Sequence, residues 1–429
     1  MGTDIVFDVS HLITRLTQAA TTGIDRVDLA YARHFLGNPA MPCSSTQYGL
    51  YRPHVLGTGQ SRRLLSDFEE AQREHETTDN TDWLLLLKRL SGSTTSLLSS
   101  GRSSKLWKNN LVRNFARQTG FRIFWDWKAT IPEGAIYLSV AQHAFEHDRF
   151  FRWLDQRRDV WPVFFIHDLL PLDFPEFFPA GYQERFLRRL RTMRRASALI
   201  TSSQRVADRV RDEFAAHDRH NVRIHVEPLP SPLENAPSVR SSAPIGGDPY
   251  FLMIGTIEPR KNHDLLLHIW RTLADRVDFR ARLVLVGMKG WETEQTIREI
   301  DLTPELQGRV LRVSGLSPAH LKELISGAAA LLMPSFAEGY GLPIVEALSL
   351  HTPVICSDIP VFHEVSQGKA RFRKLTDGLG WRDDIVEIAK PGSGLRTYCI
   401  ECAREFVAPT WTTHFRNIDL FLASLNNAK

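Results

Sequence analysis

The sequence predicts an α/β protein made of two doubly wound domains that face a cleft. Short apolar runs of strand length alternate with helical segments, which is typical of parallel sheets with helices on both faces. This pattern stops in a segment rich in proline, serine and glycine at residues 228–249, and then starts again. The length of 429 residues is also too great for one ordinary core, so two domains are expected.

The N-terminal domain is expected to cover residues 1–235. Residues 57–120 are rich in Ser, Thr and Arg and predict an insertion or flexible flap, with a helix at Trp83–Leu90 and a mobile loop at Ser91–Ser104. The other elements expected from hydrophobic periodicity are strands at Ile5–Phe7, Ala135–Val140, Trp161–Ile166 and Ala198–Thr201, and helices at Ile24–Phe35, Tyr182–Arg195 and Gln204–Phe214.

A linker is expected at residues 236–249, followed by a C-terminal domain at 250–400. Residues 401–429 are expected to be a helical segment, for which packing back on the N-terminal domain is one arrangement. In the C-terminal domain we expect strands at Tyr250–Ile254, Arg282–Val286, Val310–Val313, Ala330–Met333 and Val354–Cys356, and helices at His263–Leu273, Ala319–Ala328 and Leu342–Leu350.

A basic turn follows the strand expected at Tyr250–Ile254, where ligands of such sheets bind. Asn262 is expected to cap the next helix, whose first N–H groups favour anions. Arg260 can grip phosphate oxygens with two N–H groups and Lys261 adds a point charge, so a diphosphate is the expected ligand. A solvated basic turn is the alternative.

A glycine loop, Glu338-Gly339-Tyr340-Gly341-Leu342, lies between an expected strand and an expected helix. Its two glycines allow positive φ and close approach of a ligand to the backbone. Glu346 lies one to two turns into the helix and can lean back toward that ligand. Carboxylates accept well from sugar hydroxyls, so two Glu residues around one loop indicate a glycosyl nucleotide. A helix-dipole acid beside an exposed Glu is the alternative.

These motifs together resemble the signature of the family 4 retaining glycosyltransferases, whose fold is GT-B. Glu338 and Glu346 match the E-x7-E pattern of that family. Thr256 departs from it, since many relatives carry Arg there, and Arg260 is the candidate to supply that cation. The resemblance covers the C-terminal domain almost continuously and is carried by Gly255–Asn262, Leu285–Gly287, Trp291, Ser314–Gly315, Ser335–Leu348, Thr352–Ile355 and Pro360–Val365.

The resemblance implies a role for each of these site residues. Arg260 and Lys261 would hold the donor diphosphate, and Glu346 would bind the ribose hydroxyls. Glu338 and the backbone of Gly339, Tyr340, Gly341 and Leu342 would meet the donor sugar and the distal phosphate. The base would lie near Val313 and Leu316.

The N-terminal domain carries a looser resemblance. Thr21–Arg26 resembles the family's N-terminal glycine loop, so the amides of Thr22 and Gly23 would face the donor diphosphate, unless this is an ordinary helix-start turn. His167 follows an apolar strand, and the family resemblance implies that it reaches the active site as a catalytic residue. Asp168 would contact the acceptor or orient His167.

The implied reaction uses no metal and no cofactor besides the nucleotide-sugar donor. No D-x-D pair follows a strand, so cationic side chains and helix dipoles would stabilise the leaving diphosphate. Retention of configuration, with the leaving phosphate deprotonating the acceptor, is what the family implies. Cys399 and Cys402 form a lone C-x-x-C pair, which is a poor zinc site, and a total of four cysteines fits a reducing cytoplasm.

Charge and hydropathy bound the expected partners. A net charge of +4 is too mild to indicate nucleic acid, and no apolar run approaches the roughly 20 residues that span a bilayer. A basic run near a membrane surface suits anionic lipid headgroups on the inner face, although a solvated helix face is the alternative. The two basic stretches are residues 102–122 and the arginines Arg185, Arg188, Arg189, Arg191, Arg194 and Arg195.

Three functions stay open at this level. The favoured one is a hexosyltransferase of surface-polysaccharide synthesis with a glycan or lipid-linked acceptor, and GDP-mannose is the first guess for the donor, with UDP- or dTDP-sugars as alternatives. A GT-B phosphorylase or epimerase is a second enzyme class, but no pyridoxal phosphate lysine context is seen. A catalytically dead nucleotide-sugar-binding scaffold is the non-enzyme alternative.

Overall fold

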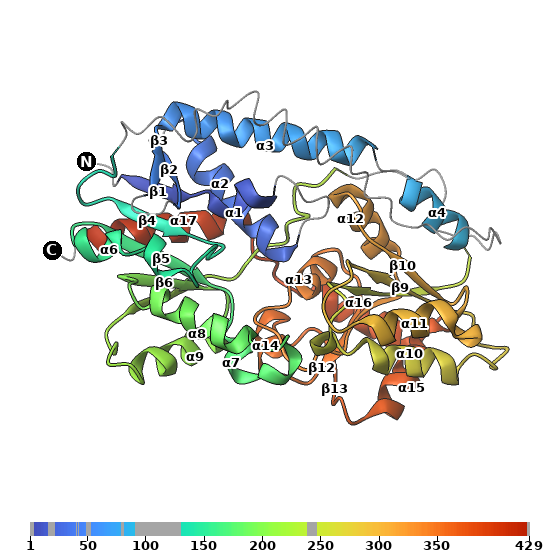
Figure 1. The fold of residues 1–429 in the computed structure, drawn as a ribbon. Coiled ribbons are helices and arrows are strands. Elements are labelled where there is room, and N and C mark those ends of the chain that lie inside the picture. The colour runs from blue at the N-terminus through green and yellow to red at the C-terminus, as the bar shows by residue number, and fades with distance from the viewer. Residues whose placement is uncertain are drawn as a thin grey trace.

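The structure, a computed structural model, describes residues 4–15, 22–39, 41, 43–48, 53–78, 81–90, 130–237 and 247–426. Two separate sheets, each with helices on both faces, form an N-terminal half (described residues 4–237) and a C-terminal half (247–426) (Figure 1). The predicted α/β class with two doubly wound sheets is confirmed. In the described part of the chain, no helix is both long and apolar enough to cross a membrane.

The sheet of the N-terminal half has the strand order β3-β2-β1-β4-β5-β6-β7, and only the β2–β3 pair is antiparallel. Strands β2, β3 and β7 were not predicted from the sequence because their segments CSSTQ, HVL and RIHV lack a clear apolar run. The strands are β1 (Ile5–Asp8), β2 (Cys43–Gln47), β3 (His54–Leu56), β4 (Ile136–Ser139), β5 (Trp161–Ile166), β6 (Ala198–Thr201) and β7 (Arg223–Val226).

The sheet of the C-terminal half is wholly parallel, with the order β10-β9-β8-β11-β12-β13. The chain starts in the centre at β8 and reverses its winding direction between β8 and β11, so the carboxyl ends of these neighbours flank a crevice. The strands are β8 (Tyr250–Ile254), β9 (Arg282–Val286), β10 (Val310–Val313), β11 (Ala330–Met333), β12 (Val354–Ser357) and β13 (Arg371–Arg373).

Helices cover both sheets. In the N-terminal half they are α1 (Ser10–Arg15), α2 (Gly23–Gly37), α3 (Thr58–Thr78), α4 (Thr81–Leu90), α6 (Trp153–Gln156), α7 (Leu170–Asp173), α8 (Tyr182–Met193) and α9 (Gln204–Ala215). In the C-terminal half they are α10 (His263–Thr272), α11 (Glu294–Leu302), α12 (Pro318–Gly327), α13 (Leu342–Ser349), α14 (Pro360–Val365), α15 (Gly378–Ala389), α16 (Gly394–Arg404) and α17 (Trp411–Asn426).

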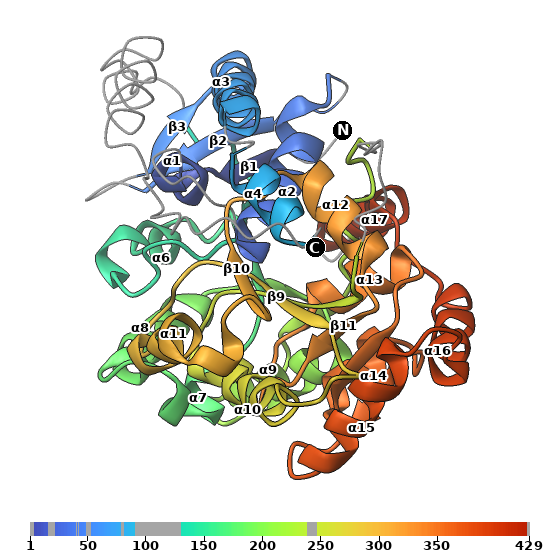
Figure 2. The same ribbon diagram turned by 90° about the vertical axis from the view of Figure 1, so that its right-hand side faces the viewer.

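The segment expected to be an insertion or flap joins the two halves. Helix α3 packs along α2 and β2, whereas α4 reaches the C-terminal half and lies beside α12 and β10 (Figures 1 and 2). The indole of Trp83 stacks on His320 with ring centroids 4.6 Å apart, and Arg282 Nη1 donates to the carbonyl of Leu90 at 2.8 Å. The loop predicted at 91–104 and the basic stretch at 102–122 lie outside the described residues.

The last helix, α17, follows α16 in the chain but packs against the N-terminal half, where it contacts α2. The phenol of Tyr31 and Nε2 of His414 are 2.9 Å apart, and the rings of His34 and Phe415 stack at 4.1 Å. Asn417 also donates to Glu227 at 3.2 Å. The C-terminus therefore ties the end of the chain to the first sheet.

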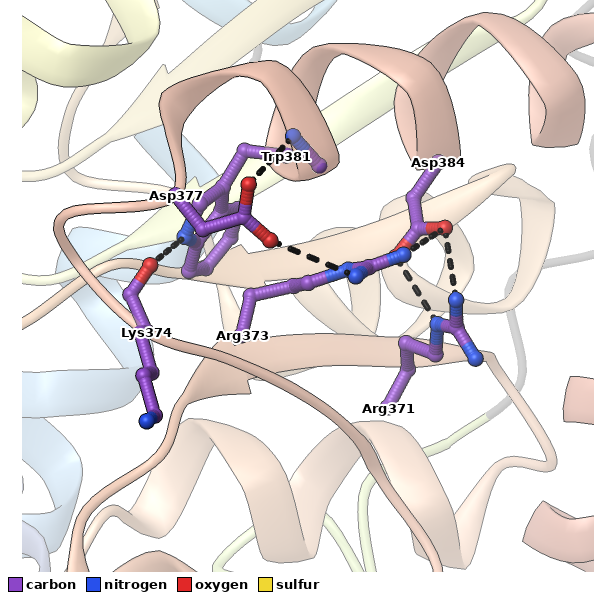
Figure 3. A network of polar contacts seen from close by, with 7 residues as sticks. Arg371, Arg373, Lys374, Asp377, Trp381 and Asp384 are labelled. Atoms are coloured by element: carbon purple, nitrogen blue, oxygen red, sulfur yellow. Dashed lines mark hydrogen bonds and ion pairs between the residues drawn. The ribbon is translucent and has the colours of Figure 1, made fainter.

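An arginine–aspartate network fastens the far edge of the second sheet (Figure 3). Arg371 and Arg373 of β13 donate from Nε to Asp384 of α15 at 2.8 and 2.6 Å. Burial alone would raise the pKa of Asp384, but the hydrogen bonds from Arg373 and Arg371 lower it below its usual value. These residues are not among those that line the cavity described next, so the network serves packing.

Candidate functional site

A cavity of about 840 Å³ opens between the two halves, at the carboxyl ends of β5, β8 and β11. Its volume lies in the range of pockets that hold ligands of nucleotide size. Val313 is buried in β10 and does not line the cavity. Of the two residues predicted to lie near the nucleotide base, only Leu316 is on the cavity wall. The predicted site residues that line it are Thr22, Gly23, His167, Asp168, Arg260, Lys261, Leu316, Glu338, Gly339, Tyr340, Gly341, Leu342 and Glu346.

Glu338 lies at the centre of a cluster of paired charges on the C-terminal wall. Arg260 Nη1 is 2.6 Å from one oxygen of Glu338, and Lys261 Nζ is 2.5 Å from the other. Arg260 Nη2 also contacts the buried carboxylate of Glu258 at 2.5 Å, a partner that the sequence analysis missed. The two cations are thus balanced by two acids, and Glu338 is held by them.

The pairing fixes the charge state of this cluster. Burial alone would raise the pKa of Glu338, but the attraction of Arg260 and Lys261 lowers it to about 2. The same carboxylates raise the pKa of the Arg260 guanidinium, against the effect of its burial. Arg260 Nε is buried and has no partner among the described residues, so the cluster retains a donor for an anion.

The helix that follows the basic turn does not present its N-terminus to the cavity. Residues Pro259–Lys261 form a short 3₁₀ turn, and Asn262 adopts a left-handed conformation with φ of 56° and no side-chain cap bond. Asn262 and His263 are not among the lining residues. Asn262 does stand at the N-cap position of α10, as predicted, but its side chain makes no cap bond to the helix.

The start of α13, by contrast, does open onto the cavity. Gly341 occupies the N-cap position with φ of 112°, which a residue with a Cβ rarely adopts, and no described side chain caps this helix. Leu342 and Pro343 follow on the cavity wall. The backbone here is a helix N-terminus without a carboxylate cap, which suits a phosphate.

Helix α2 begins on the opposite wall of the cavity, and its own first residues cap its N-terminus. Thr22 Oγ1 accepts from the backbone of Asp25 at 3.3 Å, and Asp25 Oδ2 accepts from the backbone of Thr22 at 2.6 Å, which is a capping box. Asp25 also pairs with His11 and Arg15, each at 2.7 Å. A carboxylate thus already occupies the helix start at which the sequence predicted diphosphate-binding amides.

Gly339 of the glycine loop lies close against the N-terminal half. A Cβ at Gly339 would lie 2.6 Å from the carbonyl oxygen of His167 and 2.7 Å from Cβ of Asp168. The glycine is required by this contact, because any side chain would push the halves apart. Tyr340 adds a hydrogen bond from its phenol to the carbonyl of Leu229 at 2.9 Å.

His167 is neutral at physiological pH. Burial lowers its pKa to about 4, despite a hydrogen bond to the carbonyl of Val140 at 2.9 Å. A carbonyl only accepts, so Nε2 carries the proton and Nδ1 keeps its lone pair. The ring can therefore accept a hydrogen bond from a ligand hydroxyl.

Asp168 sits beside it with one oxygen accepting from the backbone of Leu170 at 3.1 Å. Burial raises the pKa of Asp168 above its usual value, an effect opposed by the nearby Arg260. No hydrogen bond between Asp168 and the ring of His167 is found among the described residues. Asp168 therefore does not orient the ring in this state, and the carbonyl of Val140 does so.

Glu346 on α13 is paired across the cavity with Arg26 of α2, a residue to which the sequence analysis gave no role. The distance from Arg26 Nη1 to Glu346 Oε1 is 2.6 Å, and the Glu346 side chain is 1% exposed. The two residues are 320 positions apart, so only the folded chain brings them together.

The overall arrangement is similar to that of a solved sucrose-phosphate synthase from Thermosynechococcus elongatus. The TM-score is 0.58 over the full length of both chains, at 14% sequence identity. A likeness at this identity concerns the fold alone, and it confirms the predicted GT-B arrangement of two Rossmann-like units.

A family comparison identifies the class of the segment that holds most of the site. Residues 236–370 match the model of the family described as glycosyl transferases group 1. The match confirms the predicted resemblance for this segment of the chain.

Two curated relatives are similar to about half of the chain. The serotype-specific mannosyltransferase WbdA of Escherichia coli is 32% identical over 236 residues, which cover 49% of this chain and 28% of WbdA. The O-antigen chain mannosyltransferase RfbU of Salmonella typhimurium is 28% identical over 223 residues, or 52% of this chain and 59% of RfbU. The chain therefore spans between about a quarter and three fifths of these relatives.

Proposed function

We propose that the protein is a glycosyltransferase that moves a hexose from a nucleotide sugar to a glycan or lipid-linked acceptor in surface-polysaccharide synthesis. The proposal rests on one cavity that is lined by Arg260, Lys261 and His167, and also by Glu346 and the uncapped start of α13. This set offers donors for a diphosphate on one wall and acceptors for sugar hydroxyls around it. The similarity to two mannosyltransferases favours mannose, and GDP-mannose is the first donor to test.

The donor is proposed to lie along the C-terminal wall, in the domain at 250–400. Its diphosphate would rest on Arg260, Lys261 and the backbone at Gly341–Leu342, its ribose on Glu346, and its base near Leu316. Because Glu338 already pairs with both cations, we assign it first to holding them in place and second to the donor sugar. Thr22 and Gly23 face the donor from the opposite wall as shape-determining groups, since Asp25 caps their helix.

The chemical step we propose is a metal-independent transfer with retention. The bond between the anomeric carbon and the phosphate oxygen breaks, and an acceptor hydroxyl forms a new bond to the same carbon and face. The acceptor proton passes to the departing phosphate oxygen. Arg260 and Lys261 stabilise the charge that develops on this phosphate, and neutral His167 accepts a hydrogen bond from the sugar or the acceptor.

The acceptor is proposed to enter from the N-terminal half, residues 1–235, near an anionic membrane surface on the cytoplasmic side. Three of the six arginines on α8 and just after it are already paired with acids: Arg189 with Glu146, Arg194 with Glu213, and Arg195 with Asp148 and Asp155.

Arg185, Arg188 and Arg191 are exposed at three-residue spacing beside Leu187, which is 45% exposed. At about 1 kcal/mol per basic residue, this face contributes about half of what the six arginines would provide. Sedimentation with phosphatidylglycerol vesicles should weaken in a triple Arg→Glu variant of these three residues, while phosphatidylcholine vesicles bind neither protein. Equal sedimentation of both proteins would contradict the membrane proposal.

Two measurements test the central proposal. A thermal-shift series with GDP, UDP, ADP and dTDP sugars should select one nucleotide, because a ligand of the folded state raises the melting temperature. The selected sugar should then be consumed when a mannose-bearing glycan or lipid-linked acceptor is supplied, without added metal. Selection of UDP or dTDP sugars would overturn the GDP-mannose assignment, and stabilisation without any turnover would favour a nucleotide-sugar-binding scaffold.

A further inference from the structure

We propose that Arg26 is a positioning residue through which the N-terminal half takes part in nucleotide recognition: it holds the carboxylate of Glu346 in the orientation that receives the ribose diol. The inference deepens the proposed function and rests on its assignment of Glu346 to the ribose. It gives the N-terminal half a share in ribose recognition, in addition to the diphosphate contact that the sequence suggested for Thr22 and Gly23.

The contact is a buried ion pair that crosses the cavity. Arg26 Nη1 and Glu346 Oε1 are 2.6 Å apart, with side chains 22% and 1% exposed. Both residues line the cavity, one from the first turn of α2 and the other from α13. Burying a carboxylate without a charged partner is costly, and Arg26 is the cation that contacts Glu346 among the described residues.

Each residue of the pair has a buried polar atom without a hydrogen-bond partner among the described residues, which indicates a ligand. Oε2 of Glu346 and Nε of Arg26 are both buried, and neither has a hydrogen-bond partner among the described residues. Buried polar atoms are normally satisfied, so two orphans on one contact beside a cavity indicate a missing hydrogen-bonding group. A vicinal diol matches Oε2, because its two O–H groups donate to a carboxylate oxygen while Oε1 stays on Arg26.

The pair also links recognition to the closeness of the two halves. Arg26 is carried by α2, which the capping box at Thr22 and Asp25 holds in place, and Glu346 is carried by α13. Gly23 on α2 lies near Leu342 at the start of α13, since a Cβ at Gly23 would be 3.3 Å from Leu342 Cδ1. Glu346 is therefore correctly oriented only when the two halves are together, so ribose binding and closure favour each other.

The test compares two ligands that differ only in the diol. Calorimetric titration of the full-length protein uses GDP and 2′,3′-dideoxy-GDP, or the UDP pair if the thermal-shift series selects UDP. In Arg26→Ala, we expect GDP to bind at least about tenfold more weakly, since a hydrogen bond to a charged group is involved. The dideoxy ligand should bind Arg26→Ala and the wild type with the same affinity, because it lacks the two hydroxyls that donate to Glu346.

Three further variants serve as controls for the effect of Arg26→Ala. Arg26→Lys keeps the charge and should recover part of the GDP affinity even if Arg26→Ala folds poorly. In a Glu346→Ala background, Arg26→Ala should have no added effect, because the two residues act through one contact. Arg152→Ala removes an exposed arginine of the same half that pairs with Asp148 outside the cavity, and it should leave both affinities unchanged.

Each other outcome overturns the inference in a recognisable way. An equal loss for both ligands would mean that Arg26 contacts phosphate or base, and tighter GDP binding in Arg26→Ala would make Arg26 a competitor of the ribose. Unchanged GDP affinity would refute a role in donor binding. If the wild-type protein binds no nucleoside diphosphate at all, the proposed function itself fails, which is distinct from a failure of the Arg26 assignment.

Discussion

Two helix N-termini face the same cavity from opposite walls, and they differ in what occupies them. The start of α13 has Gly341 at the cap position and no described side chain bonded to it, and it lies near the paired cations Arg260 and Lys261. The start of α2 is closed by its own capping box, with the carboxylate of Asp25 on the backbone N–H of Thr22. Two termini of the same kind therefore offer opposite electrostatics to a ligand.

The difference teaches that a glycine or small-residue turn before a helix does not by itself make an anion site. The macrodipole favours an anion at both helix starts, but at α2 the protein supplies that anion itself. At α2 this anion is the carboxylate of Asp25, the third residue of the helix. The first turn of α13 contains no acid, so its N-terminus stays free for an anion of the ligand. We therefore expect changes beside α13 to affect diphosphate binding far more than changes beside α2.

The largest effect is expected from Lys261→Met, which removes a cation on the α13 side while keeping most of the volume. Loss of one preorganised charge beside a leaving phosphate typically costs about 100-fold or more in kcat. Turnover of the selected nucleotide sugar measures it. Lys390→Met removes an exposed lysine paired with Glu387 and should change turnover by less than about twofold. A similarly small effect of Lys261→Met would remove the distinction between the two walls.

A second, smaller effect is expected from Gly341→Ala at the start of α13. Its φ of 112° is unfavourable for alanine, and the new Cβ would lie 3.0 Å from Phe362 Cε1. We expect a loss of about 1–3 kcal/mol in the free energy of unfolding, together with weaker pyrophosphate binding. Urea unfolding and calorimetric titration provide the two readouts.

Gly392→Ala is the matched control for this change. Gly392 also has a positive φ, of 70°, but nothing lies within 4 Å of its added Cβ and it does not line the cavity. It should lose stability through its backbone alone and bind pyrophosphate like the wild type. If both variants bind pyrophosphate equally well, the α13 start does not hold the anion.

The smallest effect is expected on the α2 side, from Asp25→Asn. Removing the negative charge should open this helix start to anions and tighten pyrophosphate binding by about two- to fivefold, in line with about 0.3–1 kcal/mol for a charge at a helix terminus. Weaker binding instead would show that Arg15 and His11, the partners that Asp25 releases, matter more than the helix start.

The same variant makes a prediction about pH. Burial tends to raise the pKa of Asp25, but bonds from His11 and Thr22 and the charge of Arg15 lower it below its usual value of 3.8. A lowered pKa in the folded state contributes stability that is present above pH 3.8 and is lost as the pH falls below it. The unfolding free energies of wild type and Asp25→Asn should therefore converge in acid, and parallel curves would contradict this assignment.

Much of the fold follows from local sequence pattern. The apolar runs at Trp161–Ile166, Tyr250–Ile254 and Ala330–Met333 match β5, β8 and β11 to the residue. The strands that were missed are polar or short, and they are strands because the neighbouring strand supplies their hydrogen bonds. The helix predicted at Trp83–Leu90 exists as α4, but its contact with α12 could not be read from periodicity.

The sequence by itself determined that Arg260, Lys261, Glu338 and Glu346 would follow strand ends on one sheet, because the carboxyl ends of parallel strands share an edge. Only the tertiary structure decided which charged partner each of these side chains has. Glu338 pairs with both cations, and Glu346 pairs with Arg26. Asn262 and Val313 do not line the cavity. The physical reason is that an ion pair depends on distance and burial in space, and residues hundreds of positions apart leave no local pattern of their meeting.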